Sequence, residues 1–472
     1  MNDISASTIQ VVLNQCLGLL IFYVCSRYLP KEVFGELNWG LASSALLIAI
    51  IGMGIDIIII KRIARGDDSR ETIGLHFIHV LYTGTLLLLL LLGTYLLLPA
   101  RYSNSILLPC IFISQVFTSF ASPFRQLANG NRSFRHLAII ATISPLIKAL
   151  LLLVCIWTNH FTIINIALIY VIGSVLELVA GIAITLFRKR SSIFPLYWNN
   201  KKYFALIKES MPQYGVSIFN IVVARFDWIM LGILTTTVIT AEYSFAYKIF
   251  ELSRLPLLII SPILIPIFVK LFHDNRTITT KTQLKLDLLF QMEMLISVMI
   301  PVVLISCWSP LMDWLTDNKY GRVNEITFML LAVCVPLQFA TDYYWNLCFA
   351  QHQLRLTFII SVSSGIINIA INLALIPFIG AMGAAIAYIS CFVLQLILFK
   401  RYTKQDKVKP NLLVLVKTVL SAVAALWITR YITQHIIAAP VIALSLYIIF
   451  SMITQVMLPQ KIRPALRLFS MR

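Results

Sequence analysis

Charged side chains are scarce in this chain of 472 residues, and so are long polar segments. Charged residues make up 12% of the sequence and hydrophobic residues 59%, with a mean hydropathy of +0.87. A soluble protein of this length has no interior large enough to hide that much apolar surface. Connecting segments do not much exceed about 20 residues, which leaves no room for an extramembrane domain. We therefore expect a protein whose solvent is lipid.

The sequence also lacks the patterns that support disulfides, metal sites or nucleotide hydrolysis. All eight cysteines lie inside apolar runs, without a CxxC pair, and are expected to be small core hydrophobes. We expect no metal ion and no cofactor. A Walker sequence is absent, so ATP hydrolysis is not expected of this chain.

What the sequence does contain is a succession of apolar stretches, each able to cross a hydrocarbon core of about 30 Å as a helix. Helices are expected because they satisfy every backbone polar group within one segment. The predicted fold is an all-α polytopic membrane protein with fourteen transmembrane helices. These lie near residues 5–28, 34–60, 72–98, 104–128, 136–157, 162–187, 206–234, 240–268, 286–308, 326–349, 355–377, 380–400, 410–430 and 438–458.

Lysine and arginine are distributed unequally between the segments that join these spans. With the amino terminus in the cytoplasm, the cytoplasmic segments carry 28 of the 38 basic residues and the opposite segments carry 6. The positive-inside rule then predicts that both termini are cytoplasmic. The net charge of +18 is explained by topology and by contact with lipid headgroups, so no nucleic-acid partner is expected. Four basic residues lie at the depth of the spans: Lys148, Arg225, Lys248 and Arg254.

Short internal echoes indicate that the chain is built twice. Residues 35–40 resemble residues 241–246, and residues 115–118 correspond to residues 338–341, with further echoes in order at nearly the same offset. Two lobes of equal orientation are typical of transporters that alternate between two openings. The predicted units are two six-helix lobes and an additional helix pair, in residues 1–190, 200–402 and 408–460.

Several motifs give this architecture a family resemblance. The first lobe carries LPKEVFGEL at residues 29–37 and KRIAR at residues 61–65. The second carries ESMP, RFDWIMLG and AEYSFAY, which begin at residues 209, 225 and 241. The chain resembles the multidrug/oligosaccharidyl-lipid/polysaccharide exporter superfamily, and within it the bacterial polysaccharide flippases of the Wzx type. Ala241 is a departure, because this family usually has glycine there.

The resemblance implies a cargo, a location and partners. The cargo would be an undecaprenyl diphosphate that carries an oligosaccharide, such as an O-antigen unit of lipopolysaccharide or a capsule unit. Alternating access would move it from the cytoplasmic to the periplasmic leaflet of the bacterial inner membrane. Membrane lipids and the polymerase and chain-length regulator of the same pathway are the implied partners. The chain would be a transporter and not an enzyme, driven by the membrane potential or by coupling to protons or sodium.

Basic residues at bilayer depth are the first candidates for contact with an anionic cargo. A cation there costs between about 3 and over 10 kcal/mol, depending on snorkelling and water access, so it is seldom idle. Lys248 and Arg254 share the eighth span with Glu251, and helical geometry places them on or beside one face. They either draw in the diphosphate or form ion pairs with Glu251 at a spacing of three residues. Lys148 is a further candidate for substrate binding.

Arg225 and Asp227 lie two residues apart and therefore project from different sides of the seventh span. One of them is expected to contact the cargo and the other a neighbouring helix. We favour Arg225 for the cargo.

Polar side chains suited to sugars lie on one face of the fourth span and one face of the tenth. Their amide and indole groups can bind hydroxyls and stack on sugar rings, and interhelical hydrogen bonding is the alternative. The substrate-binding candidates on these faces are Gln115, Gln338, Trp345 and Asn346. The ion-coupling candidates are the acidic residues Asp56, Glu177, Asp227, Glu251 and Asp342.

Other functions share some of these features. A polymerase or ligase of the same pathway would need a sizeable periplasmic loop, whereas the outward loops here are short. A drug or cation exporter on the same scaffold would favour an acidic, aromatic cavity, whereas this chain places four cations at depth. A lipid II flippase of the same superfamily is the closest rival to a polysaccharide flippase.

Overall fold

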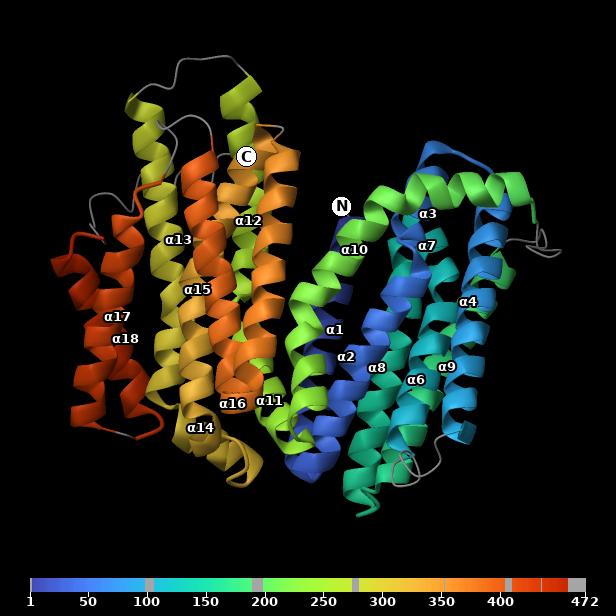
Figure 1. The fold of residues 1–472 in the computed structure, drawn as a ribbon, viewed down its shortest axis with the longest axis horizontal. Coiled ribbons are helices and arrows are strands. Elements are labelled where there is room, and N and C mark those ends of the chain that lie inside the picture. The colour runs from blue at the N-terminus through green and yellow to red at the C-terminus, as the bar shows by residue number, and fades with distance from the viewer. Residues whose placement is uncertain are drawn as a thin grey trace. The chain divides into compact units, whose positions relative to one another are not determined.

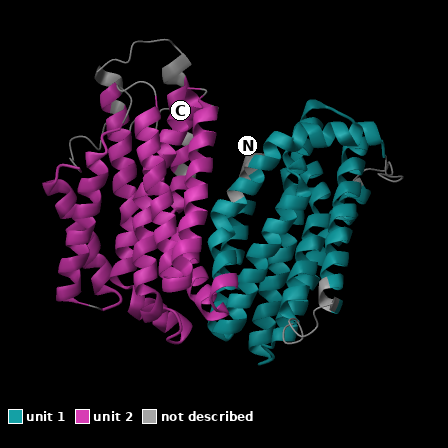
Figure 2. Cartoon of the chain, in the orientation of Figure 1, with its two compact units in different colours: residues 1–232 teal, residues 233–472 magenta. Residues whose placement is uncertain are grey.

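The structure is a computed structural model. In the residues that it describes, all regular secondary structure is helical. It describes residues 2–97, 106–188, 198–273, 280–351, 353–403, 410–433 and 435–456. The chain divides into two compact units, unit 1 with residues 1–232 and unit 2 with residues 233–472 (Figure 2). The predicted all-α fold is confirmed.

Unit 1 is a helical bundle (Figure 1). Its helices are α1 (Asn2–Tyr28), α2 (Lys31–Gly52), α3 (Ile55–Arg65), α4 (Ser69–Leu97), α6 (Leu107–Phe120), α7 (Ser122–Gly130), α8 (Phe134–Trp157), α9 (Ile163–Arg188) and α10 (Asn200–Leu234), of which the last ends just beyond the unit. α6 packs against α2, α4 and α9, and α8 packs against α1 and α9. Met53 and Gly54 adopt left-handed backbone angles, with φ of 48° and 66°, and these separate α2 from α3.

The described contacts of α10 are with unit 1, although the internal repeat assigns this helix to the second lobe. Its two segments, Asn200–Phe219 and Ile221–Leu234, are inclined at 44°. The first segment lies across the ends of α3 and α4 (Figure 1), where Leu206 joins an apolar cluster with Ile59. In the second segment the carbonyl oxygen of Ile229 accepts a hydrogen bond of 3.2 Å from the Trp39 indole.

The compact unit 1 therefore extends to Gly232. The division into lobes of residues 1–190 and 200–402 and a helix pair in residues 408–460 stays a prediction.

Unit 2 is built around one central helix, α15. Its helices are α11 (Thr237–Ser253), α12 (Leu255–His273), α13 (Thr280–Ser306), α14 (Trp308–Thr316), α15 (Gly321–Ala350), α16 (Leu354–Tyr402), α17 (Leu413–Ile432) and α18 (Ala438–Ile453). α15 packs against α11, α12, α13, α14 and α16. The pair α17–α18 covers α13, where the Tyr447 hydroxyl donates to the Leu295 carbonyl oxygen at 3.0 Å. The central place of α15 brings its polar face together with residues from several helices.

α16 contains a sharp turn at Gly380. This residue has φ 53° and ψ −126°, a left-handed backbone conformation that glycine adopts more readily than other residues. A Cβ added to Gly383 would lie 2.8 Å from the carbonyl carbon of Leu375, so the two sides of the turn touch through their backbones. α16 is thus two helical segments, in agreement with the separate spans predicted at residues 355–377 and 380–400.

By length and apolar character, 10 described helices can cross a membrane, or 11 if the bent α10 is one span. The number is below the predicted fourteen for three structural reasons. The two segments of α16 count as one helix here, the predicted eighth span is divided between α11 and α12, and α18 is a shorter apolar helix of 16 residues. A multi-pass membrane protein is confirmed.

Candidate substrate and ion site

A polar cavity in unit 2 lies where the junction of α11 and α12 meets α15 and α16. Its volume is about 170 Å³. It is lined by Arg254, Leu257, Gln338, Thr341, Asp342, Trp345, Ser361, Phe392, Gln395 and Phe399. The cavity brings together four of the site residues that the sequence predicts: Arg254, Gln338, Asp342 and Trp345.

Arg254 reaches the cavity because α11 ends immediately before it. Its backbone N–H donates to the carbonyl oxygen of Glu251 at 3.2 Å, and α12 begins at the next residue. Its Nε is buried and has no hydrogen-bond partner among the described residues. The guanidinium therefore retains donor capacity for an anion.

The polar face of α15 is organised by side-chain hydrogen bonds. Gln338 Nε2 donates to the Tyr388 hydroxyl of α16 at 3.0 Å, and the Gln338 Oε1 atom is buried without a partner in the described part of the chain. Asn346 Nδ2 donates to Asp342 Oδ2 at 2.8 Å and to Ser261 Oγ of α12 at 3.0 Å. Asn346 is fully buried and is not one of the lining residues, so its contact with substrate stays a prediction.

Trp345 supplies the exposed aromatic group of this face. Its side chain is 38% exposed and stacks on Phe349, with ring centroids 5.3 Å apart. On α16, Gln395 Nε2 donates to Ser364 Oγ at 2.9 Å and its side chain lines the cavity. An exposed indole beside amides is the combination that a sugar needs, because its hydroxyls require partners and its ring carbons require an apolar face.

Lys248 and Glu251 form an ion pair of 2.8 Å at the predicted spacing of three residues. Both side chains are about a quarter exposed, at 24% and 27%. Lys248 thus has an acidic partner on its own helix, and its contact with the cargo stays a prediction. Arg254 differs because it lies at the end of α11 and faces the cavity.

In unit 1, most of the predicted charged residues have protein partners. Arg125 Nη1 and Glu177 Oε1 are 2.5 Å apart, and Arg125 also donates to the Thr118 carbonyl oxygen at 3.0 Å. Asp56 accepts from Ser122 Oγ at 2.6 Å and lies 3.1 Å from His76 Nε2. These contacts link α3, α4, α7 and α9.

Lys148, Arg225 and Asp227 are the remaining charged candidates of unit 1. The Lys148 ammonium lies over the Tyr170 ring at 5.0 Å from its centroid. The Arg225 guanidinium stacks over Trp228 at 4.5 Å from the ring centroid. Asp227 is 3% exposed and accepts from the Trp228 backbone N–H at 2.9 Å. Gln115 lies half-buried on α6. These four residues and the unit 2 cavity belong to different units, so their roles in substrate binding or coupling stay predictions.

Comparison with known proteins identifies the family to which this chain belongs. Residues 1–272, more than half of the chain, match the family described as polysaccharide biosynthesis protein. The chain belongs to the polysaccharide biosynthesis protein family. No curated protein sequence matches it significantly.

Solved structures show the fold of this polysaccharide biosynthesis family member. It resembles the lipid II flippase MurJ in an inward closed conformation, with 14% identity and a TM-score of 0.72 over 95% of this chain and 98% of the other. It also resembles a multidrug MATE transporter of the MOP superfamily in an inward-facing conformation, with 14% identity and a TM-score of 0.63 over 83% and 96%. An outward-facing MATE structure matches with 13% identity and a TM-score of 0.54, over 83% and 91%. The predicted superfamily architecture is confirmed.

Several buried polar residues of this family member were not predicted from the sequence. Glu293 on α13 is 2% exposed, and His76 and His79 on α4 are 2% and 1% exposed. Glu293 lies within the ninth predicted span, and an acidic residue at that depth was enough to mark it as a candidate site residue. Arg125 lies within the fourth predicted span, near its end, but it was counted among the basic residues of the cytoplasmic segments and so was not considered as a buried charge.

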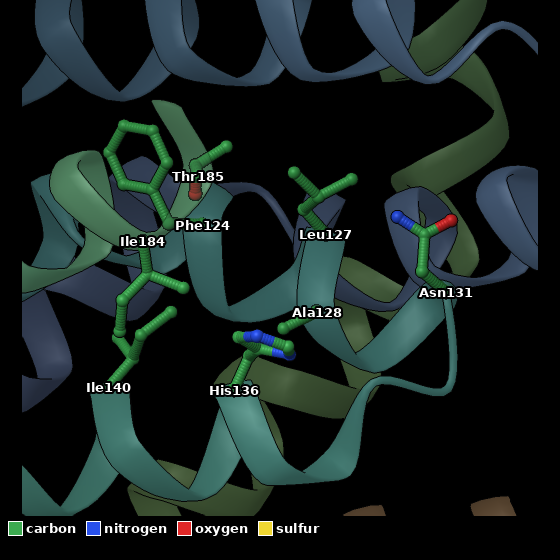
Figure 3. Close-up of a pocket in the computed structure, with 8 residues that line it drawn as sticks. All are labelled: Phe124, Leu127, Ala128, Asn131, His136, Ile140, Ile184 and Thr185. Carbon is green, nitrogen blue, oxygen red and sulfur yellow. The ribbon is translucent and has the colours of Figure 1, made fainter. Parts of the chain in front are cut away.

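A second cavity, of about 350 Å³, lies in unit 1 between α7, α8 and α9. Figure 3 shows the His136 ring and the Asn131 amide on one side of it and Phe124 and Thr185 on the other. The remaining lining residues are Leu127, Ala128, Ile140 and Ile184. None of the lining residues is among the predicted site residues, and the lining is mostly apolar.

Proposed function

We propose that this chain is a flippase that moves undecaprenyl-diphosphate-linked oligosaccharide units from the cytoplasmic to the periplasmic leaflet of the bacterial inner membrane, with both termini in the cytoplasm. O-antigen or capsule units are the proposed cargo. Membership in the polysaccharide biosynthesis family and the fold shared with MurJ and MATE transporters support a transporter of glycan precursors. Alternating access is the proposed mechanism, as is usual for two-lobe transporters.

The observation that carries the proposal is Arg254 in the polar cavity of unit 2. A buried guanidinium with an unused donor suits a phosphate, because an arginine fork binds phosphate oxygens through charge-assisted hydrogen bonds. Gln338 and Trp345 in the same cavity suit a sugar. One cavity thus offers groups for both polar parts of the cargo.

The size of the cavity limits what it holds. At about 170 Å³ it is smaller than the roughly 300–1,000 Å³ of pockets that enclose a whole small molecule. We infer that it binds one phosphate or one sugar ring, and that the rest of the oligosaccharide and the polyprenyl chain contact other surfaces.

The membrane potential favours the proposed direction. Moving one negative charge outward across an inside-negative potential of about 100 mV releases roughly 2.3 kcal/mol. A diphosphate cargo would thus contribute to its own export.

A lipid II flippase is the second candidate, favoured by the likeness to MurJ over 95% of this chain. The two cargoes share the polyprenyl diphosphate and differ in the sugar. A deletion strain separates them. Loss of surface polysaccharide with an intact cell wall supports the glycan cargo, and lysis through loss of peptidoglycan supports lipid II.

The role of Arg254 is tested by substitution in a strain that depends on this chain. We expect Arg254→Ala to lower the amount of surface glycan at least tenfold, because loss of a charge-assisted hydrogen bond costs about 1.5 kcal/mol or more. Immunoblotting should show an unchanged amount of protein in the membrane. Arg254→Lys should recover part of the export, since a lysine keeps the charge without the fork.

The matched control is Arg430→Ala. Arg430 is 68% exposed on α17 and lies 3.7 Å from Glu325, so its loss should leave export unchanged. Normal export by Arg254→Ala would remove this residue from the site.

A further inference from the structure

The cavity of unit 1 lies where the ends of α7, α8 and α9 meet. Asn131 directly follows α7, His136 is in the first turn of α8, and Thr185 is in the last turn of α9. The volume of about 350 Å³ falls within the roughly 300–1,000 Å³ of pockets that enclose a small molecule. The cavity is therefore large enough for a ligand and lies at one end of the helices that line it.

Polar and apolar groups are segregated within this cavity. The His136 ring and the Asn131 amide lie on one side of it (Figure 3). On the other side lie Phe124 and Thr185, and the Thr185 hydroxyl already donates to the Gly181 carbonyl oxygen at 2.6 Å. Donor groups for a ligand are thus concentrated on the first side, whereas the rest of the lining suits hydrocarbon. A ligand with one polar end and one apolar end fits this arrangement.

The segment that forms the cavity carries charge of almost one sign. Residues 122–190 contain seven lysines and arginines and a single acidic residue, Glu177. The Glu177 carboxylate already forms an ion pair with an arginine of α7. Arg132, in the turn between α7 and α8, and Arg135, at the start of α8, are both exposed. The polar end of the ligand is therefore expected to be an anion.

The predicted orientation places this end of unit 1 at the cytoplasmic leaflet. The turn between α7 and α8 belongs to the basic segments that the positive-inside rule assigns to the cytoplasm. That leaflet has a negative surface potential because of its anionic lipids, and basic pockets between transmembrane helices on this side bind their headgroups. An anionic lipid also supplies the apolar end that the lining requires.

We propose that the cavity between α7, α8 and α9 binds one anionic glycerophospholipid of the cytoplasmic leaflet, such as phosphatidylglycerol. The lipid phosphate accepts hydrogen bonds from His136 and Asn131 and is attracted by the charges of Arg132 and Arg135. Part of an acyl chain occupies the apolar lining beside Ile140. The bound lipid connects the ends of three helices. This inference goes beyond the proposed function and does not depend on it, because the ligand is a component of the membrane and not the cargo.

Thermal unfolding of the purified full chain in detergent tests the binding, since a ligand of the folded state raises the unfolding temperature. We expect phosphatidylglycerol to raise it in the parent protein, and zwitterionic phosphatidylcholine with the same acyl chains to leave it unchanged. In Arg132→Gln/Arg135→Gln, the phosphatidylglycerol concentration that gives half of the shift should rise by about tenfold or more. The matched control Lys400→Gln/Arg401→Gln removes two exposed charges from the predicted cytoplasmic side of unit 2 and should respond as the parent does.

The cavity itself is tested by Ala128→Phe and by a photoactivatable phosphatidylglycerol. Ala128 lines the cavity, so the added ring fills part of it without changing any charge, and the response to phosphatidylglycerol should be lost. The photoactivatable lipid requires no variant and keeps the test decisive if Ala128→Phe does not fold. In the parent its cross-links should map to residues 124–140 and 184–185, and excess phosphatidylglycerol should suppress them whereas excess phosphatidylcholine should not.

Four results would overturn the proposal. An equal shift with phosphatidylcholine would show that the cavity does not recognise charge, and the same shift with inorganic phosphate alone would show that it does not recognise a lipid. A larger shift with a polyprenyl phosphate than with phosphatidylglycerol would assign the cavity to the cargo. An unchanged response of Arg132→Gln/Arg135→Gln, with cross-links elsewhere in the chain, would place the lipid at another site.

Discussion

At the scale of single residues, the stability of unit 1 depends on how buried charges are paired. The Arg125 side chain is 25% exposed and that of Glu177 is 3% exposed, so Glu177 has almost no access to water. A buried ion pair adds little net stability, but removing one member leaves the other uncompensated. The contribution of this pair is therefore seen only when it is broken.

Arg125→Met should destabilise the purified protein by about 3–5 kcal/mol, because Glu177 would be left buried without its cation. The double variant Arg125→Met/Glu177→Leu should recover most of this loss. Thermal unfolding in detergent measures both, with Arg135→Met as a control at an exposed arginine. Equal losses in the single and double variants would contradict a paired role.

At the scale of elements, the short helix α3 fixes the position of the first half of α10. α3 begins after Gly54, with φ 66°, and ends at Gly66, with φ 95°. At its far end, Arg62 Nη2 donates to Glu209 of α10 at 2.8 Å. At its beginning, a Cβ on Gly54 would lie 2.7 Å from the backbone nitrogen of Tyr214. α10 is thus held at both ends of α3, by an ion pair and by direct backbone contact.

Gly54→Ala should loosen α10, whereas Gly66→Ala should not. Both substitutions introduce strain of about 1–3 kcal/mol at a left-handed position. Only the first also pushes on a neighbouring backbone, since nothing lies within 4 Å of a Cβ at Gly66. Hydrogen–deuterium exchange of residues 200–219 is the measurement, and faster exchange is expected for Gly54→Ala alone. Equal exchange in both variants would mean that the close contact does not hold α10.

At the scale of the whole molecule, the charge distribution predicts which ends of the helices face the cytoplasm. The turn at His160 joins α8 to α9, and Lys201 lies near the start of α10, after the 26 residues of α9. A helix of that length is about 39 Å long, enough to cross the hydrocarbon core. These two positions are expected on opposite sides of the membrane.

A membrane-impermeant thiol reagent added to cells with a permeable outer membrane should label His160→Cys and not Lys201→Cys. Opening the inner membrane should make Lys201→Cys reactive. The parent protein, with its own eight cysteines, sets the background. Labelling of Lys201→Cys in intact cells would reverse the predicted orientation.

The sequence predicted those features that depend on spacing along one helix. Gln338, Asp342 and Trp345 share a cavity because residues four and seven apart lie on one helical face. The environment of Glu293 could not be predicted in this way, because it depends on how α13 packs against α15. Likewise, the partner of Arg225 is Trp228, three residues away, whereas the partner of Asp56 on α4 is His76, which requires the folded bundle. The assignment of α10 to unit 1 also arises from contacts between distant segments.

The turn at Gly380 has a consequence for how the chain enters the bilayer. A straight helix of 49 residues would be about 74 Å long, more than twice the hydrocarbon thickness, so α16 must reverse direction. A single glycine makes this reversal, with the backbones of Gly383 and Leu375 in contact. No hydrophilic loop has to be translocated between the two segments. They can therefore partition into the lipid together during synthesis, as one preformed helical hairpin.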